Sequence, residues 1–362
     1  MLDGADGTGV SSYARALMAA AALGGWTPSI VHATRGQGAV ARLARWATAA
    51  SGRRRPLRLA GGDLVGDDIF RVAQIHFDWW RRPLVLDAPG PPGIAHWTYP
   101  LPLRIAGWAN LYTIHDVIPL AQPELTSISP DRHRRLLSAI MHPAAGLVTV
   151  SAAAKADIVR ATGCAPDFVT DCGQAALLPE PDRETPAGLR RGGYFVYCGL
   201  IEPRKNLLRL IAAHARAATG LPLVIVGPDG WRAGPILAAI AAGGDVLRLS
   251  YQERPALAAL IRDARALLFP SLAEGFGLPV AEAMTLGTPT LISRDPALVE
   301  VAGRAALSVD GEDVDAIAAG IARMASDDAL RARLSTDGLA RARDFSLDRF
   351  AERLGRLYAS LA

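Results

Sequence analysis

The sequence is poor in lysine and takes its positive charge almost entirely from arginine. Lys155 and Lys205 are its only lysines among 39 Lys and Arg residues, which face 35 Asp and Glu residues and leave a formal net charge of +4. A charge this small is typical of a soluble protein, and a basic patch for phosphates or anionic lipid is the alternative interpretation. We expect no nucleic-acid partner.

Cysteine is scarce as well. Cys164, Cys172 and Cys198 are odd in number and fit neither a metal-binding nor a redox spacing. Free thiols of this kind favour a reducing compartment, so we expect a cytoplasmic protein without a metal site.

A membrane-spanning run and a secretory signal are both missing from the pattern. The longest apolar stretch, residues 14–26, is interrupted by Arg15 and a glycine pair and is too short to cross a bilayer. Asp3 and Asp6 stand where a signal peptide would carry basic residues.

The length of 362 residues is too great for one hydrophobic core and predicts two domains. In the second half, continuous apolar runs alternate with helix-length segments, a pattern that predicts a doubly wound parallel α/β domain. The expected strands are Tyr194–Cys198, Leu223–Val226, Val246–Leu249, Ala266–Phe269, Thr290–Ile292 and Ala306–Val309, and the expected helices include Asn206–Ala218, Pro255–Ala264 and Val280–Leu286.

The first half repeats this pattern less clearly. Its expected strands are Ser29–His32, Gly93–Trp97, Leu111–Ile114 and Leu147–Val150, and residues 35–87 are expected to contain helical segments and an arginine cluster. We therefore predict an N-terminal domain over residues 1–178, a Pro- and Gly-rich linker over 179–193 and a second domain over 194–345. The last segment, 346–362, is a helix that we expect to pack back on the first domain.

A glycine turn opens the first helix unusually early. Gly7, Thr8 and Gly9 precede a predicted helix at Val10–Ala22, and only residues 1–3 are left to form the strand that normally feeds such a turn. We expect this first strand to be absent and the functional protein to start upstream of Met1.

The most informative motif lies at residues 270–283, where a predicted strand leads into a helix with the sequence PSLAEGFGLPVAEA. Gly275 and Gly277 allow close backbone approach to a ligand, and the free N–H groups of a helix start bind anions. Glu274 precedes the helix, and Glu282 is expected in its first turn. Two carboxylates beside an N–H cradle suit a sugar nucleotide, although a glycine turn with a capping glutamate explains the spacing equally well.

A second motif, GLIEPRKN at residues 199–206, also joins a predicted strand to a helix. Arg204 and Lys205 stand at the helix start, where the dipole disfavours cations. Their placement suggests an anionic partner such as a diphosphate; the alternative is a solvated basic turn.

Further loops follow other predicted strands. The turn beginning at Gly227 and the loop with Tyr251 follow strands of the second half, so four loops converge at the carboxyl edge of one sheet, where ligands bind in such folds. In the first half, His96 and His115 also end strands. A sugar- or phosphate-binding role and a structural role remain open for both histidines, the structural one being favoured for His96.

Two segments of the first half together mix arginine with aromatic residues: residues 53–55 are three arginines, and residues 77–82 read FDWWRR. This mixture suits a membrane interface, and a solvated charged face is the alternative.

Together these motifs resemble glycosyltransferase family 4, which has the GT-B fold of two Rossmann-like domains facing a central cleft. The match consists of the Glu-x7-Glu motif of retaining transferases, formed by Glu274 and Glu282, with Glu300 further on. The surrounding segments GLIEPRKN, VGPDGW, ARALLFPS and GTPTLIS resemble the family, as do GTGVSSYARAL, NLYTIHDVIPL and LVTVSAAAKADIV in the first half.

The resemblance implies a role for each matching residue. Glu282 would bind the donor ribose, while Glu274 would hold the donor sugar beside the backbone of Phe276–Leu278. Lys205 and Arg204 would neutralise the diphosphate. Gly199, Gly275, Gly227 and Tyr251 would line the donor site; His115 would face the reacting sugar, and the loop of Gly7, Thr8 and Gly9 would lie near phosphate and acceptor.

Two positions depart from the family pattern. Leu200 stands where many members have arginine, a charge that Arg204 would replace, and Ala152 follows Val150-Ser151 where the family often has glutamate.

The resemblance predicts a retaining transfer of a sugar, mannose being one candidate, from a GDP-, UDP- or dTDP-linked donor. The expected acceptor is a saccharide or a polyprenyl-diphosphate-linked saccharide in polysaccharide biosynthesis. No cofactor beyond this nucleotide-sugar co-substrate is expected, and a peripheral contact with the cytoplasmic face of the inner membrane is one option. The alternatives are an epimerase-like activity and an inactive partner subunit; a phosphorylase is disfavoured because only two lysines are available to hold pyridoxal phosphate.

Overall fold

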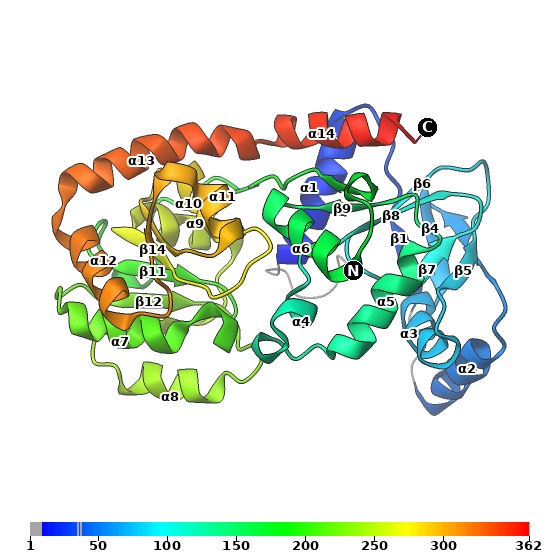
Figure 1. Ribbon diagram of the computed structural model, residues 1–362, viewed down its shortest axis with the longest axis horizontal. Coiled ribbons are helices and arrows are strands. Elements are labelled where there is room, and N and C mark those ends of the chain that lie inside the picture. The colour runs from blue at the N-terminus through cyan, green and yellow to red at the C-terminus, as the bar shows by residue number, and fades with distance from the viewer. Residues whose placement is uncertain (1–8, 35, 37, 362) are drawn as a thin grey trace. The chain divides into compact units, whose positions relative to one another are not determined.

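The computed structural model describes residues 9–34, 36 and 38–361 (Figure 1). The chain divides into two compact units, and each is described by itself. The first unit comprises Met1–Pro123, Ile128–Gly173 and Phe350–Ala362, and the second comprises Glu124–Ser127 and Gln174–Arg349. The segment 179–193, predicted as a linker, lies within the second unit.

The second unit contains a six-stranded parallel sheet with the order β13-β12-β11-β14-β15-β16. Its strands are β11 (Phe195–Cys198), β12 (Leu223–Val226), β13 (Val246–Leu249), β14 (Ala266–Phe269), β15 (Thr290–Ser293) and β16 (Ala306–Val309). Every residue of β11, β12, β14 and β15 is buried, because helices cover both faces of the sheet. The continuous apolar runs of the sequence thus became the interior strands.

Helices follow the strands of this sheet in alternation. They are α7 (Leu207–Ala217), α8 (Gly234–Ala242), α9 (Arg254–Asp263), α10 (Leu278–Thr285), α11 (Pro296–Ala302), α12 (Val314–Ser326) and α13 (Asp328–Ala342). In Figure 1, α7 and α8 lie below the strands of the second unit, and α9 and α10 lie above them. The chain runs from β11 outward to β13 and then returns to the centre at β14, so β11 and β14 flank the topological switch point.

The first unit divides its strands among three sheets in the described part of the chain. One has the order β10-β9-β8-β6 and is parallel; the second is β1-β4-β3, in which β3 is antiparallel; the third, β2-β5-β7, is parallel. The strands are β1 (Val31–Thr34), β2 (Arg55–Pro56), β3 (Arg58–Ala60), β4 (Asp63–Asp67), β5 (Leu84–Asp87), β6 (Ile94–Trp97), β7 (Leu103–Ile105), β8 (Ala109–Thr113), β9 (Gly146–Thr149) and β10 (Val169–Asp171).

The helices of the first unit pack around these sheets. They are α1 (Gly9–Leu23), α2 (Gly38–Ala50), α3 (Ile69–Trp80), α4 (Ile118–Ala121), α5 (Pro130–Met141) and α6 (Ala152–Thr162). The last helix, α14 (Leu347–Ala359), contributes its residues from Phe350 onward to the same unit. Its ring contacts include α1 and the loop after it: between ring centroids, Phe350 lies 5.8 Å from Tyr13, and Tyr358 lies 5.3 Å from Trp26. Tyr358 also lies 5.8 Å from the ring of His96 in β6.

The α/β class with parallel sheets is as predicted, but residues 35–87 contain more strand than expected. This segment includes β2, β3, β4 and β5 beside the helices α2 and α3. The strands are two to five residues long and mix charge with apolar residues, so their pattern resembles that of a loop. Residues 1–3, Gly7 and Thr8, on which the early glycine turn was predicted, lie outside the described residues.

Candidate functional site

Two loops meet at the switch point of the second sheet. One follows β11 and contains the short helix η4 (Pro203–Lys205); the other follows β14 and leads into α10. The backbone joins them where the N–H of Leu272 donates to the carbonyl of Arg204 over 2.9 Å. Because ligands of doubly wound sheets bind outside the carboxyl ends of the strands at this point, these loops form the candidate site.

The loop after β12 packs directly against the loop after β11. Ile201 and Asp229 form an isolated bridge, and a Cβ atom at Gly227 would fall 2.0 Å from the carbonyl oxygen of Gly199. Only glycine fits this contact, and its φ of 145° is one that other residues rarely adopt. Gly227 therefore shapes the floor of the site through its backbone contact with the neighbouring loop.

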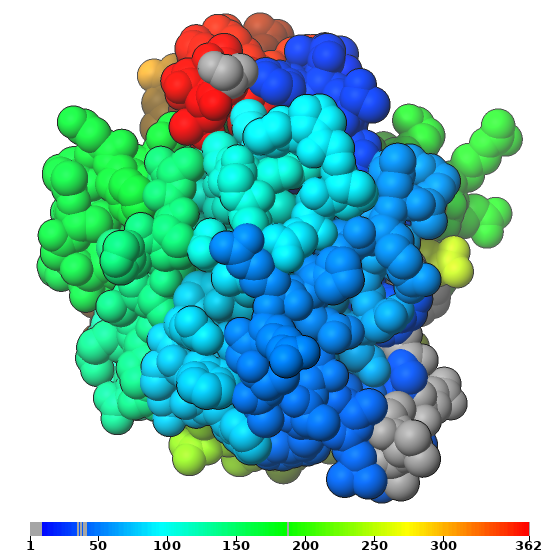
Figure 2. Space-filling view, turned by 90° about the vertical axis from the view of Figure 1, so that its right-hand side faces the viewer, coloured from blue at the N-terminus to red at the C-terminus, as the bar shows by residue number. Residues whose placement is uncertain are grey.

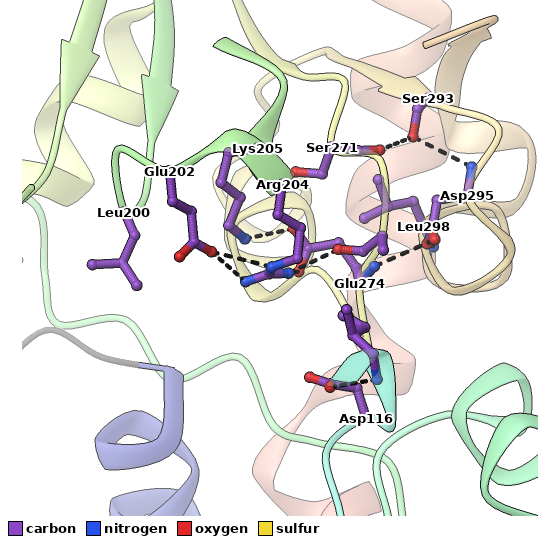
Figure 3. Close-up of polar contacts among 12 residues, drawn as sticks. Asp116, Leu200, Glu202, Arg204, Lys205, Ser271, Glu274, Ser293, Asp295 and Leu298 are labelled. Carbon is purple, nitrogen blue, oxygen red and sulfur yellow. Dashed lines mark hydrogen bonds and ion pairs between the residues drawn. The ribbon is translucent and has the colours of Figure 1, made fainter. Parts of the chain in front are cut away.

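Glu274 is the centre of a buried charge cluster (Figure 3). Its carboxylate accepts from Lys205 Nζ over 2.5 Å and from Arg204 Nη1 over 3.0 Å, and its side chain is 8% exposed. Arg204 also donates to Glu202 over 2.8 Å and to the carbonyl of Ala273 over 2.7 Å. The cluster thus holds two cations and two carboxylates on adjacent loops, as predicted for Glu274, Arg204 and Lys205 but with Glu202 added.

The charged residues in this cluster shift one another's pKa values. Burial by itself raises the pKa of Glu274, but Lys205 and Arg204 outweigh it and hold that pKa at about 2. Burial lowers the pKa of Lys205, and the neighbouring Arg204 charge acts in the same direction, whereas Glu274 opposes them. Glu274 is therefore a carboxylate at neutral pH, and its negative charge supports the buried ammonium.

The sequence analysis expected an anionic partner for Arg204 and Lys205, and the chain itself provides carboxylates. Both cations lie in η4 ahead of α7, and Glu202 and Glu274 pair with them. The alternative of a solvated basic turn does not apply, because Lys205 is buried. The pairing with Glu274 spans 69 or 70 residues of sequence, so local pattern could not reveal it.

Glu282 lies in the second turn of α10, not in the first turn as predicted, because the helix already begins at Leu278. Its buried carboxylate accepts from Arg254 Nη2 over 2.6 Å, and the same nitrogen donates to the carbonyl of Leu177. Burial raises the pKa of Glu282, and Arg254 opposes that shift. Sequence analysis missed Arg254, which stands at the start of α9 without a distinctive motif.

The turn into α10 is held by close packing. Gly277, the residue before the helix, has a φ of 90°, and a Cβ atom there would fall 2.3 Å from Leu298 Cδ2. Phe276 is buried with its ring 5.4 Å from that of Phe345. The glycine predicted to admit a ligand thus also admits a side chain of α11.

Asp295 supports the same loop from the start of α11. Its Oδ1 caps that helix by accepting from the N–H of Leu298 over 3.1 Å, and its Oδ2 accepts from the N–H of Glu274 over 3.3 Å (Figure 3). Burial raises the pKa of Asp295 to about 6, with the Glu274 charge adding to the effect. Sequence analysis did not name Asp295; an Asp-Pro pair at the start of a helix is the signal that could have identified this cap.

The other residues considered for the donor site of the second unit differ in exposure. Leu200, which departs from the family pattern, is partly exposed beside Glu202, and Tyr251 is exposed in the loop after β13. Gly275 is buried between Glu274 and Phe276 in the loop that leads into α10. Whether these residues contact a donor stays a prediction.

In the first unit, the two histidines have different surroundings. His96 lies between Tyr358, 2.7 Å from Nδ1, and Thr113, 2.8 Å from Nε2, and burial lowers its pKa to about 3. These contacts fit the structural interpretation. His115 places Nε2 2.9 Å from the carbonyl of Thr98, and burial lowers its pKa, so its ring is neutral at pH 7 with the lone pair on Nδ1.

Gly9 begins α1 and is the described part of the predicted phosphate loop. Across residues 9–34, 36 and 38–361, no group of three or more His, Cys, Asp or Glu residues is placed to hold a metal ion. Over the same ranges, no helix combines the length and the apolar character that a membrane crossing requires.

The glycosyl transferases group 1 family matches residues 186–341, which include both loops of the candidate site. The O-antigen chain mannosyltransferase B of Escherichia coli is 32% identical over 250 residues, covering 65% of this chain and 66% of that protein. Sucrose-phosphate synthase from Thermosynechococcus elongatus superposes with a TM-score of 0.70 at 19% identity, covering 98% of this chain and 94% of that one. HepE from Anabaena, solved with UDP and glucose, gives a TM-score of 0.69 at 15% identity, with 99% and 98% covered.

Residues 186–341 are thus similar to the glycosyl transferases group 1 family. The chain has the α/β fold of GT-B glycosyltransferases, as its solved neighbours show. It spans just under two thirds of the length of the mannosyltransferase it matches.

Proposed function

We propose that the protein is a retaining glycosyltransferase that takes its sugar from a nucleotide diphosphate bound at the switch point of the second unit. The observation that carries this proposal is the buried cluster of Glu274, Lys205 and Arg204 on the two switch-point loops of a group 1 domain. A buried pair of cations costs desolvation free energy that a purely structural role does not require. A diphosphate leaving group provides the charge that such a pair stabilises.

The cluster would act by positioning and by charge stabilisation. Glu274 fixes Lys205 through one of the three N–H donors of the ammonium, and Glu202 and Glu274 fix the guanidinium plane of Arg204. Cations held in place before the donor binds stabilise the developing negative charge of the leaving diphosphate without reorganising in the transition state. Glu274 would in addition accept hydrogen bonds from hydroxyls of the donor sugar.

Glu282 would bind the ribose of the donor. It is a buried carboxylate held by one arginine, Arg254, so it retains acceptor capacity for hydroxyl groups. His115, neutral at pH 7, would contribute a hydrogen bond to the reacting sugar. No metal would be required, because Arg204 and Lys205 supply the positive charge.

Mannose is the sugar that we propose, with a saccharide or lipid-linked saccharide as acceptor. The support is the mannosyltransferase name of the relative at 32% identity, which assembles O-antigen chains according to that name. The donor base stays open between GDP, UDP and dTDP; the UDP complex of HepE shows only what that neighbour binds.

The test begins with a thermal-shift screen of the purified chain against GDP-, UDP- and dTDP-sugars, followed by transfer of a labelled sugar to a lipid-linked or free saccharide. We expect one nucleotide class to raise the melting temperature and to support transfer with the anomeric configuration retained. If the donor binds but is neither transferred nor hydrolysed, the protein is better described as an inactive partner subunit. If the free nucleotide sugar is converted to an isomer, the epimerase-like activity is favoured.

We also propose a peripheral contact with an anionic membrane surface through α2 and α3. Trp46, Trp79 and Trp80 are each about half exposed, and the rings of Trp46 and Trp79 lie 5.5 Å apart. The guanidinium of Arg82 lies over Trp80 at 5.5 Å, and Arg53 is exposed nearby in sequence. Figure 2 views the first unit from the side on which these blue segments form much of the surface.

Exposed tryptophans ringed by arginine are typical of proteins that lie at the headgroup level of a bilayer. Co-sedimentation with phosphatidylglycerol vesicles tests this contact, with phosphatidylcholine vesicles as the charge control. Trp79→Ser should weaken binding to the anionic vesicles, whereas Leu339→Ser, which changes an exposed apolar residue of the second unit, should not. Equal binding of both variants would remove α3 from the contact.

A further inference from the structure

Arg204 presents the two edges of its guanidinium to two different carboxylates. Its Nη1 atom donates to Glu274 Oε2 over 3.0 Å and to the carbonyl of Ala273 over 2.7 Å, so this edge is tied to the loop after β14. The other edge, formed by Nε and Nη2, donates to Glu202 Oε1 over 3.1 Å and 2.8 Å. Such a planar pair of donors also matches the oxygens of a phosphate group, so Glu202 occupies an edge of Arg204 that suits a diphosphate.

The cluster has no excess of positive charge while Glu202 is in place. Lys205 and Arg204 bring two positive charges, and Glu202 and Glu274 bring two negative charges. A diphosphate adds further negative charge, and like charges at close range disfavour binding. The site therefore attracts a diphosphate more strongly if one of the two carboxylates withdraws from its cation.

The two carboxylates are held differently. Glu274 pairs with Lys205 as well as Arg204, its backbone N–H donates to Asp295, and its side chain is 8% exposed. The side chain of Glu202 is 14% exposed, and among the described residues Arg204 is the partner in each of its hydrogen bonds. In Figure 3, Glu202 and Glu274 lie on opposite sides of Arg204. Rotation of Glu202 away from Arg204 therefore leaves the other contacts of the cluster in place, whereas movement of Glu274 breaks several of them.

We propose that Glu202 is an internal competitor of the donor diphosphate: it holds the Nε and Nη2 edge of Arg204 in the free protein, and a diphosphate displaces it from that edge. This proposal rests on the donor site proposed above. The exchange takes place on binding, before the transfer step, and the contact between Arg204 and Glu274 is kept. After transfer, the returning Glu202 carboxylate weakens the interaction of Arg204 with the nucleoside diphosphate and favours its release.

A Glu202 that only supports Arg204 would have the opposite effect on affinity, and calorimetry with inorganic pyrophosphate and with GDP, UDP and dTDP in metal-free buffer separates the two roles. Glu202→Gln keeps an acceptor oxygen and removes the charge. We expect it to tighten the binding of pyrophosphate, and of the nucleoside diphosphate that binds the parent, by about fivefold or more. Glu184→Gln removes the same charge from an exposed position of the second unit and should change these affinities by less than about twofold.

Two further comparisons keep the result specific. Glu202→Ser removes the carboxylate by a different substitution and should change the affinity for pyrophosphate in the same direction as Glu202→Gln, and melting curves identify the variants that are folded. The nucleoside without phosphates should bind the parent and Glu202→Gln equally well, because it does not reach Arg204 with a charged group.

Three results would count against these proposals. Unchanged or weaker pyrophosphate binding in the Glu202 variants would overturn the competitor role and make Glu202 a support for Arg204. Equal tightening of nucleoside and pyrophosphate would also overturn it, because the effect would then not depend on the diphosphate. Failure of GDP, UDP and dTDP to bind the parent would contradict the proposed donor site, and the pyrophosphate comparison would still decide the role of Glu202.

Discussion

The second unit pairs each interior strand of its sheet on both edges, whereas the first unit divides its strands among three sheets with more open edges. The interior strands β11, β12, β14 and β15 are fully buried, but β1 is only partly buried and β6 alternates. In the second unit, the same strands thus have both edges hydrogen-bonded to neighbouring strands and their apolar side chains buried. In the first unit, burial is only partial along β1 and β6.

The difference extends to the charges. The second unit concentrates buried charge at its switch point, where Glu274, Lys205 and Arg204 neutralise one another. The first unit keeps its arginines of residues 53–55 and 81–82 largely exposed beside tryptophans. A buried charged group needs partners that the fold holds in place, and such a fixed arrangement is typical of a catalytic or binding site. Exposed arginines beside aromatic rings are typical of a protein surface that contacts a membrane.

The largest expected effect of a substitution falls on the charge cluster of the second unit. Lys205→Ala should lower turnover by about 100-fold or more, because it removes one of the two cations that we propose to stabilise the leaving diphosphate. Lys155→Ala, which removes the only other lysine of the chain from the surface of α6, is the matched control. Steady-state transfer rates and melting curves of both variants separate catalysis from folding. Full activity of Lys205→Ala would show that the cluster has a structural role, and buried charge in the second unit would then no longer indicate catalysis.

A smaller effect is expected on donor affinity. Glu282→Ala removes a buried carboxylate and leaves Arg254 with the Leu177 carbonyl as its remaining partner in these contacts. Lost hydrogen bonds to ribose cost about 1–3 kcal/mol, which corresponds to roughly tenfold to a hundredfold in affinity. Calorimetry with the nucleoside diphosphate measures the change, and Glu312→Ala, at an exposed position, is the control. Unchanged affinity would place the ribose elsewhere.

The same contrast explains what sequence patterns could predict. In the second unit, Leu223–Val226 and Ala266–Phe269 were predicted with their observed bounds, because a strand buried on both faces leaves a continuous apolar run. In the first unit, Asp63–Asp67 was missed, since a short strand with charged ends carries no such run. The pattern of apolar residues in a sequence reflects which residues are buried, so it becomes less distinct where a strand is only partly buried.

For the candidate site, the sequence predicted the loops but not the pairings between them. Glu274, Arg204 and Lys205 were named from motifs, and the structure brings them together. The partnership of Glu282 with Arg254 joins α10 to the start of α9 and depends on how the two helices pack, which no local pattern contains. Glu282 was placed one turn too early for the same reason: the start of α10 depends on Gly277 packing against Leu298.

The pH dependence of stability provides a third way to examine the cluster. Burial raises the pKa of Asp295 from 3.8 to about 6, so the folded state binds this proton more tightly than the unfolded state. The stability that protonation provides is present below about pH 4 and is lost as the pH rises to 6. A shift of about two pKa units corresponds to at most about 3 kcal/mol.

Asp295→Asn should therefore gain stability relative to the parent as the pH rises from 4 to 6, apart from a constant difference due to the altered helix cap. Urea unfolding at several pH values measures this trend, and Asp245→Asn at an exposed position is the control. Parallel curves for Asp295→Asn and the parent would show that the carboxyl of Asp295 is not desolvated in the folded protein.

The smallest expected effect is that of metal removal. Arg204 and Lys205 together carry two positive charges beside the loop that leads into α10, and the free N–H groups at a helix start add a further partial charge for an anion. Glu274 is already paired with Lys205 and Arg204, so a divalent cation at the same place would compete with these two cations for this carboxylate rather than assist them. We therefore expect transfer rates in EDTA to remain within about twofold of those in buffer without EDTA. A twofold change in rate corresponds to less than about 1 kcal/mol in activation free energy. Loss of activity on chelation, with recovery on addition of magnesium or manganese, would mean that the cation pair is insufficient and that the switch point of the second unit requires a metal to complete it.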